Sequence, residues 1–213
     1  MVRIAGVDLG ARRDHTAVAM ARLKGELLNV DACITIPLGT WQSQVDAVAD
    51  LIGDCEIAAI DSTGTGRMAY EAIHDRCPQA LPYTLTAGNK QALITTTRKR
   101  MVRGTLAMNP DGEGIDLLVD ELKRFQMMPT DSGNWRYSGK RNGGDDRVFA
   151  LLLAVAGAEL AVRDGLHLRA GLVRTSLTSI RNVRRIIHDV TICECESIGA
   201  TTPGSNCAEI AIR

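Results

Sequence analysis

The sequence has no excess of charge of either sign. Lysine and arginine together number 25, as do aspartate and glutamate, in a chain of 213 residues. A strongly basic chain would indicate a polyanionic partner, so this balance counts mildly against nucleic acid unless the two signs lie on different faces. With 45% hydrophobic and 23% charged residues, the composition is typical of a soluble globular protein.

Long apolar runs and paired cysteines are also missing. The absence of a run of about 18 apolar residues excludes a membrane span, and the early Asp8 and Arg12-Arg13 exclude a signal peptide. The six cysteines lack the Cys-x-x-Cys spacing of a zinc site, and the histidines show no metal-ligand spacing. We therefore expect a cytoplasmic protein with reduced thiols and no membrane partner.

The start of the chain predicts a β-hairpin whose first strand ends in a carboxylate. Residues 2–8 and 15–22 are apolar runs on either side of a turn that contains Gly10, and residues 27–36 continue as a third antiparallel strand. Asp8 is the last residue of the first strand. A buried carboxylate without a partner is costly, so Asp8 should either reach solvent or hold a cation.

A second predicted strand ends in the same way. Residues 56–61 are nearly all apolar, as in a strand buried on both faces beside a parallel partner, and their last residue is Asp61. Helices are predicted over residues 40–52 and 67–76, and a fifth strand over residues 81–86. If the strand of Asp61 lies parallel to the first strand and beside it, both acids lie at the sheet edge where α/β active sites form.

Two further acids precede the most apolar segment of the chain. Residues 139–147 form a basic loop that leads into a helix extending to about Val162, so Asp145 and Asp146 occupy its first turn. The helix dipole favours negative charge there, and an ordinary capping pair is one interpretation of the two acids. The other interpretation is that Asp145 and Asp146 form one site together with Asp8 and Asp61, the acids that end the two predicted strands.

The shared site would suit divalent cations. Carboxylates that converge without a cation repel one another and take up protons, whereas hard cations prefer oxygen ligands. We expect Asp8, Asp61 and Asp146 to be the catalytic ligands of two Mg²⁺ or Mn²⁺ ions, with Asp145 as an additional candidate. Two such ions activate a water and stabilise the leaving oxygen when a phosphodiester is cut.

Basic residues in two segments are candidates to contact DNA. Lys90, Arg98 and Arg100 lie on a predicted helix that follows residues 87–89, and Lys140 and Arg141 lie in the loop before the last helix. A solvated charged face is the alternative interpretation of these residues.

Taken together, these motifs resemble the nuclease domain of the large subunit of tailed-phage terminases. The resemblance rests on Gly6-Val-Asp8-Leu-Gly10, Ile60-Asp61-Ser-Thr-Gly-Thr-Gly66, Lys90, Glu121-Leu122 with Phe125, and Gly144-Asp145-Asp146 before the apolar helix. It covers roughly residues 1–163. It implies an α/β fold of the RNase H-like type, a mixed five-stranded sheet with three antiparallel and then two parallel strands, flanked by helices. It also implies a two-metal DNA endonuclease that acts in viral genome packaging.

The chain departs from this family in three respects. Gly144 stands where family members often have histidine before the two acids, and the Gly-x-x-x-x-Gly-Lys-[Ser/Thr] loop of a packaging ATPase is missing. Residues 164–213 do not fit the resemblance and are expected to form a C-terminal extension of unknown role. The resemblance therefore implies a nuclease without its motor, acting on double-stranded DNA in the host cytoplasm, with a separate packaging ATPase or portal protein as partner.

Two other interpretations stay open. A Holliday-junction resolvase-like nuclease would use the same superfold and would select branched DNA. Actin-like and sugar-kinase folds also open with Gly-x-Asp-x-Gly and a hairpin, so the chain could be a non-catalytic nucleotide-binding relative of these proteins. In that case ATP, and not divalent metal alone, would shift its thermal stability.

Overall fold

The computed structural model describes residues 1–10, 15–64, 66–129, 135–139 and 144–165. Its helices and strands are, in chain order, β1 (Val2–Asp8), β2 (Thr16–Lys24), β3 (Leu27–Ile36), α1 (Trp41–Ile52), β4 (Ile57–Asp61), α2 (Gly66–Arg76), β5 (Ala80–Tyr83), α3 (Ala87–Val102), β6 (Leu106–Met108), α4 (Ile115–Arg124), β7 (Phe125–Pro129), β8 (Trp135–Gly139) and α5 (Asp146–Arg163). The expected extension lies outside the described residues, except for residues 164 and 165.

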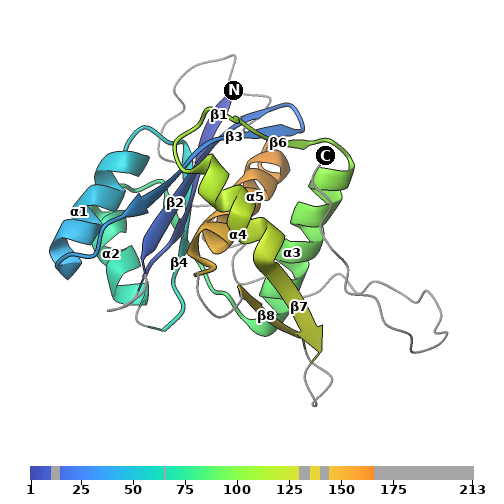
Figure 1. Cartoon of the computed structure of the whole chain (residues 1–213). Coiled ribbons are helices and arrows are strands. Elements are labelled where there is room, and N and C mark those ends of the chain that lie inside the picture. Colours follow the sequence, from blue (N-terminus) through green and yellow to red (C-terminus); the bar gives the residue numbers. More distant parts are fainter. Residues whose placement is uncertain (11–14, 65, 130–134, 140–143, 166–213) are drawn as a thin grey trace.

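The main sheet has the order β5-β4-β1-β2-β3-β6 (Figure 1). As expected, β1, β2 and β3 are antiparallel neighbours, whereas β4 lies parallel to β1 and β5 parallel to β4. The sheet also has a sixth strand, β6, which is parallel to β3 and was not predicted. Because β6 has only three residues, it is too short to show the alternation by which a strand is recognised. The remaining strands, β7 and β8, form a separate hairpin.

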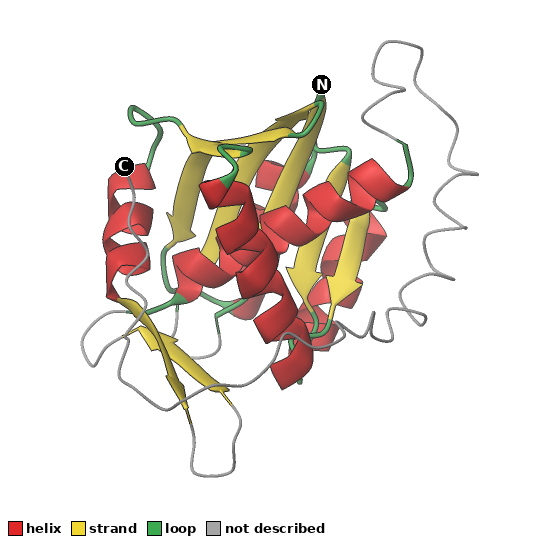
Figure 2. Ribbon diagram, turned by 90° about the vertical axis from the view of Figure 1, so that its right-hand side faces the viewer, coloured by secondary structure: helices red, strands yellow, loops and turns green. Residues whose placement is uncertain are grey.

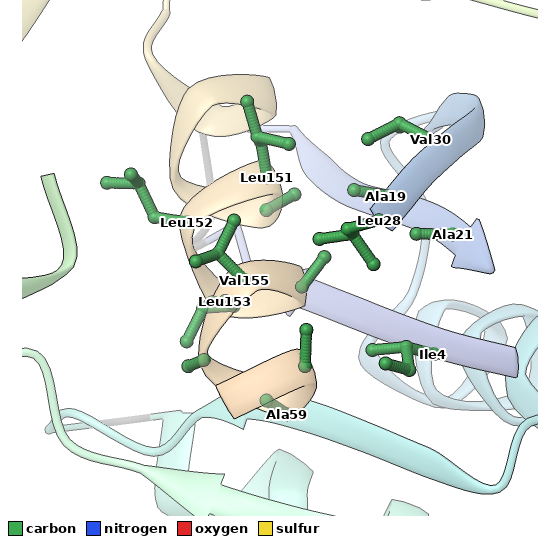
Figure 3. Packing of buried hydrophobic residues seen from close by; sticks show 14 of the residues in the cluster. Ile4, Ala19, Ala21, Leu28, Val30, Ala59, Leu151, Leu152, Leu153 and Val155 are labelled. Atoms are coloured by element: carbon green, nitrogen blue, oxygen red, sulfur yellow. The ribbon is translucent and has the colours of Figure 1, made fainter. Parts of the chain in front are cut away.

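Helices cover both faces of the sheet (Figure 2). The buried residues of α1 and α2 belong to one hydrophobic cluster, and those of α3, α4 and α5 belong to another on the opposite face. Helix α5 is apolar nearly all round, with twelve buried residues, as expected of a helix that packs in the centre of a core. Figure 3 shows Leu151 and Val155 of α5 in the same hydrophobic cluster as Ile4 and Ala19 of the central strands.

Gly6 of β1 allows α5 to lie directly on the sheet. A Cβ atom at position 6 would stand 2.1 Å from both the Ala150 carbonyl oxygen and the Ala154 backbone nitrogen, closer than any atom can approach. Farther along the helix, Gly157 faces Ile4, so α5 runs antiparallel to β1. The first turn of α5 is therefore placed at the carboxyl end of β1, next to Asp8.

Two sequence-based expectations concern the thiols and the membrane. Cys33, Cys55 and Cys77 are free and buried, as expected, and the other cysteines lie outside the described residues. No helix in the described part of the chain is long and apolar enough to cross a bilayer.

Candidate metal centre

Asp8 and Asp61 end adjacent parallel strands. The last paired residues of β1 and β4 are Val7 and Ile60, so each acid follows one position later on its own strand, and neighbouring strands are about 4.8 Å apart. Gly6 faces α5, and side chains two positions apart on a strand point to the same face. Both carboxylates are therefore directed to the face that α5 covers.

The third and fourth acids come from the start of α5. Asp145 is the N-cap residue and Asp146 is the first residue of the helix. The side chain of Asp145 makes no capping hydrogen bond, so the capping interpretation does not account for it. The charges of Asp61, Asp145 and Asp146 therefore all act on the carboxylate of Asp8.

Burial and these neighbouring charges together change the ionisation of Asp8. Burial, followed by the charges of Asp61, Asp146 and Asp145, raises the pKa of Asp8 from 3.8 to about 8, and Lys90 opposes the shift. The folded protein therefore keeps a proton on Asp8 between these pH values, whereas the unfolded chain loses it. Stability falls as the pH rises through this window, and the penalty is complete above about pH 8. A cation held by the same carboxylates would remove the penalty.

The carboxylates do not yet converge on one point. In the described part of the chain, no group of three or more histidine, cysteine, aspartate or glutamate side chains is arranged to hold an ion. Asp61 Oδ1 accepts hydrogen bonds from the backbone nitrogen of Thr63 at 2.8 Å and from its Oγ1 at 2.5 Å. Asp146 Oδ2 lies beside Gly144, only 2.7 Å from where a Cβ atom would stand.

The donor set nevertheless fits a divalent hard cation. All four side chains supply carboxylate oxygens, which are the ligands that Mg²⁺ and Mn²⁺ prefer. The backbone already places them on two adjacent strand ends and one helix start, so side-chain rotations would bring them together. The pKa of Asp8 is raised first by burial and then by the charges of the three other acids, and a cation bound there would offset both effects.

Two threonines hold the loops around the site. Thr16 is 1% exposed; its Oγ1 accepts from the Gly10 backbone nitrogen at 3.1 Å and donates to Gln44 Oε1 at 2.6 Å. Thr63 Oγ1 accepts from the Leu85 nitrogen at 2.9 Å, so the residue that binds Asp61 also contacts the segment after β5. A threonine two residues after a strand-ending acid, as Thr63 is after Asp61, is a local sequence signal for a turn in which the two side chains bind. The sequence does not indicate the distant partners, Gln44 for Thr16 and Leu85 for Thr63.

The predicted basic residues differ in where they lie. Lys90 lies in the first part of α3, with Nζ 4.7 Å from the centre of the Phe149 ring, and its charge reaches Asp8. Arg98 is exposed and lines a small apolar crevice between α3, α4 and α5, about 12 Å farther along the helix at 1.5 Å per residue. Lys140 and Arg141 lie outside the described residues.

Arg100 differs from what the sequence suggested. It is 9% exposed, and its guanidinium donates to Glu159 Oε1 at 2.8 Å and to the carbonyl oxygen of Glu26 at 2.8 Å. Its contacts join α3 to α5 and to the turn between β2 and β3. The helical periodicity of the basic segment did not distinguish this buried position from the exposed ones, and we do not assign Arg100 to DNA binding.

Comparisons with known proteins show what the chain as a whole is similar to. No protein-family model matches the chain. The chain is 27% identical to the terminase large subunit of Thermus phage G20c over 154 aligned residues. The aligned region covers 70% of the chain and 30% of that protein. The chain therefore spans less than a third of the length of this relative.

Solved structures give the same result for the fold. The large terminase nuclease of phage G20c with bound magnesium is 25% identical, with a TM-score of 0.63 over 73% of the chain and 80% of that protein. A mutant nuclease domain of the large terminase subunit gp2 of bacterial virus Sf6, with manganese, is 12% identical, with a TM-score of 0.55 over 72% of the chain and 87% of that domain. The predicted RNase H-like fold and the resemblance to terminase nuclease domains are confirmed.

Proposed function

We propose that this chain is a metal-dependent endonuclease that hydrolyses DNA phosphodiester bonds with two Mg²⁺ or Mn²⁺ ions. Asp8, Asp61 and Asp146 are the proposed ligands, with Asp145 as an additional candidate. One observation carries the proposal: Asp8 ends the central strand of an RNase H-like sheet, and burial together with the charges of Asp61 on the neighbouring strand and of Asp146 and Asp145 at the start of α5 raises its pKa to about 8. The solved relatives with magnesium or manganese support it.

Each residue has a distinct part in this proposal. Two bound ions would supply an activated water and a charge that stabilises the leaving oxygen. Asp8 would hold the ions from the end of the central strand, Asp61 from the end of the neighbouring strand β4, and Asp146 from the start of α5. Lys90 presents an ammonium beside the acids and would attract a DNA phosphate oxygen as a point charge.

The biological setting follows from the relatives. We propose a role in viral genome packaging in the host cytoplasm, with double-stranded DNA as substrate and a packaging ATPase or portal protein as partner. The support is the similarity to part of a terminase large subunit and to isolated terminase nucleases.

Supercoiled plasmid tests this function. We expect nicking followed by linearisation in Mg²⁺ or Mn²⁺, and no cleavage in EDTA, because the carboxylates alone cannot activate water at neutral pH. The products are separated on agarose gels over time. Cleavage that continues in EDTA would contradict the proposal. Strong preference for branched over linear duplex would instead favour a resolvase-type substrate.

A further inference from the structure

A buried carboxylate on α4 binds the residue that follows Asp146. Glu121 is 5% exposed and is one of four polar or charged residues that are buried in the described part of the chain. Its Oε2 accepts a hydrogen bond from the Arg147 backbone nitrogen at 3.1 Å, and its Oε1 accepts one from Arg147 Nη1. A buried charge is costly unless it is paired, so Glu121 and Arg147 act as a unit.

The backbone contact fixes the start of α5. The first backbone N–H groups of a helix have no partner within the helix, and Arg147 lies in that first turn. Glu121 satisfies this donor from a different helix, with a negative charge that suits the positive end of the helix dipole. Glu121 therefore fixes the position of the turn that carries Asp146.

The side-chain contact holds the guanidinium of the residue that directly follows Asp146. Arg147 carries a guanidinium with five N–H donors and is the immediate neighbour of Asp146 in the chain. Its Nε is buried and finds no hydrogen-bond partner among the described residues. Glu121 therefore holds the guanidinium through Nη1. The Nε–H group is still available to another acceptor, such as a carboxylate.

We propose that Glu121 is a positioning residue that keeps the Arg147 guanidinium away from the metal-binding acids. This inference rests on the proposed function, since it assumes that Asp146 binds a divalent ion. Without the charge of Glu121, the guanidinium pairs with Asp145 or Asp146 and competes with the ion. Glu121 thereby sets the metal affinity without contacting the metal.

Calorimetric titration of the full chain with Mn²⁺ tests the inference. We expect Glu121→Gln to weaken Mn²⁺ binding by about tenfold or more, the range found when groups around metal ligands are removed. Glutamine still offers an oxygen to the Arg147 backbone N–H, so the loss measures the missing charge. Arg147→Gln should keep the wild-type affinity, and the double variant Glu121→Gln, Arg147→Gln should regain it.

A second ion pair on the same helix provides the matched control. Glu159 of α5 binds Arg100 of α3 at 2.8 Å, far from the first turn, so Glu159→Gln should leave Mn²⁺ affinity unchanged. Wild-type affinity in Glu121→Gln, weakened affinity in Arg147→Gln, or no recovery in the double variant would each overturn the inference. If the wild-type chain itself does not bind Mn²⁺, the proposed function fails instead.

Discussion

Asp61→Asn and Asp146→Asn should each lower metal-dependent plasmid cleavage by at least about 10³-fold, which is about 4 kcal/mol of transition-state stabilisation at 1.36 kcal/mol per tenfold. An amide has the shape of the carboxylate but lacks the charge that holds a divalent ion. The fold should survive, because neither acid is buried in the core. Initial cleavage rates in Mg²⁺ measure the loss, and circular dichroism verifies the fold.

Asp54→Asn is the matched control for the two acid variants. Asp54 lies before β4, at the opposite end of that strand from Asp61, and its side chain is 89% exposed. The same change in charge there should leave the cleavage rate unchanged. Metal-dependent cleavage that persists at the wild-type rate in both Asp61→Asn and Asp146→Asn would contradict the assigned site.

Gly6→Ala should cost about 3 kcal/mol of unfolding free energy or more, because the added methyl group meets backbone atoms of α5 that cannot rotate away. For a chain of this size, that loss lowers Tm by roughly 6–12 °C. The remaining folded protein should bind Mn²⁺ more weakly, since α5 must move away from the strand that carries Asp8. Differential scanning calorimetry in EDTA measures the first effect.

Gly88→Ala is the corresponding control. Gly88 lies in the first turn of α3, and a Cβ there would meet no atom within 4 Å. Alanine is the better helix former, so Tm should stay the same or rise slightly. An unchanged Tm in Gly6→Ala would show that α5 does not pack directly on β1, and the placement of Asp146 beside Asp8 would then lose its basis.

The places of the acids in the fold could be predicted from sequence because each one ends or begins a strongly patterned element. The apolar runs before Asp8 and Asp61 indicate buried strands, and the apolar run after Asp146 indicates a buried helix. That β1 and β4 are neighbours was an assumption, which their parallel pairing confirms. Local pattern thus located the acids, and sheet topology brought the two strand ends together.

What could not be predicted depends on contacts between distant residues. Glu121 and Arg147 are 26 positions apart, and nothing in either segment indicates that they bind each other. Arg100 directly follows two exposed basic residues, Arg98 and Lys99. It is buried because Glu159 and the turn before β3 lie beside it. Such roles depend on how helices pack over the sheet, which hydrophobic periodicity does not specify.

The most direct test of the central claim is the location of manganese in crystals soaked in Mn²⁺, measured by anomalous scattering. The account predicts two peaks about 4 Å apart, the spacing of two-metal sites, with Asp8 bridging them and with Asp61 and Asp146 as the other ligands. Absence of manganese from this sheet edge at saturating Mn²⁺, or manganese bound only elsewhere on the chain, would contradict it.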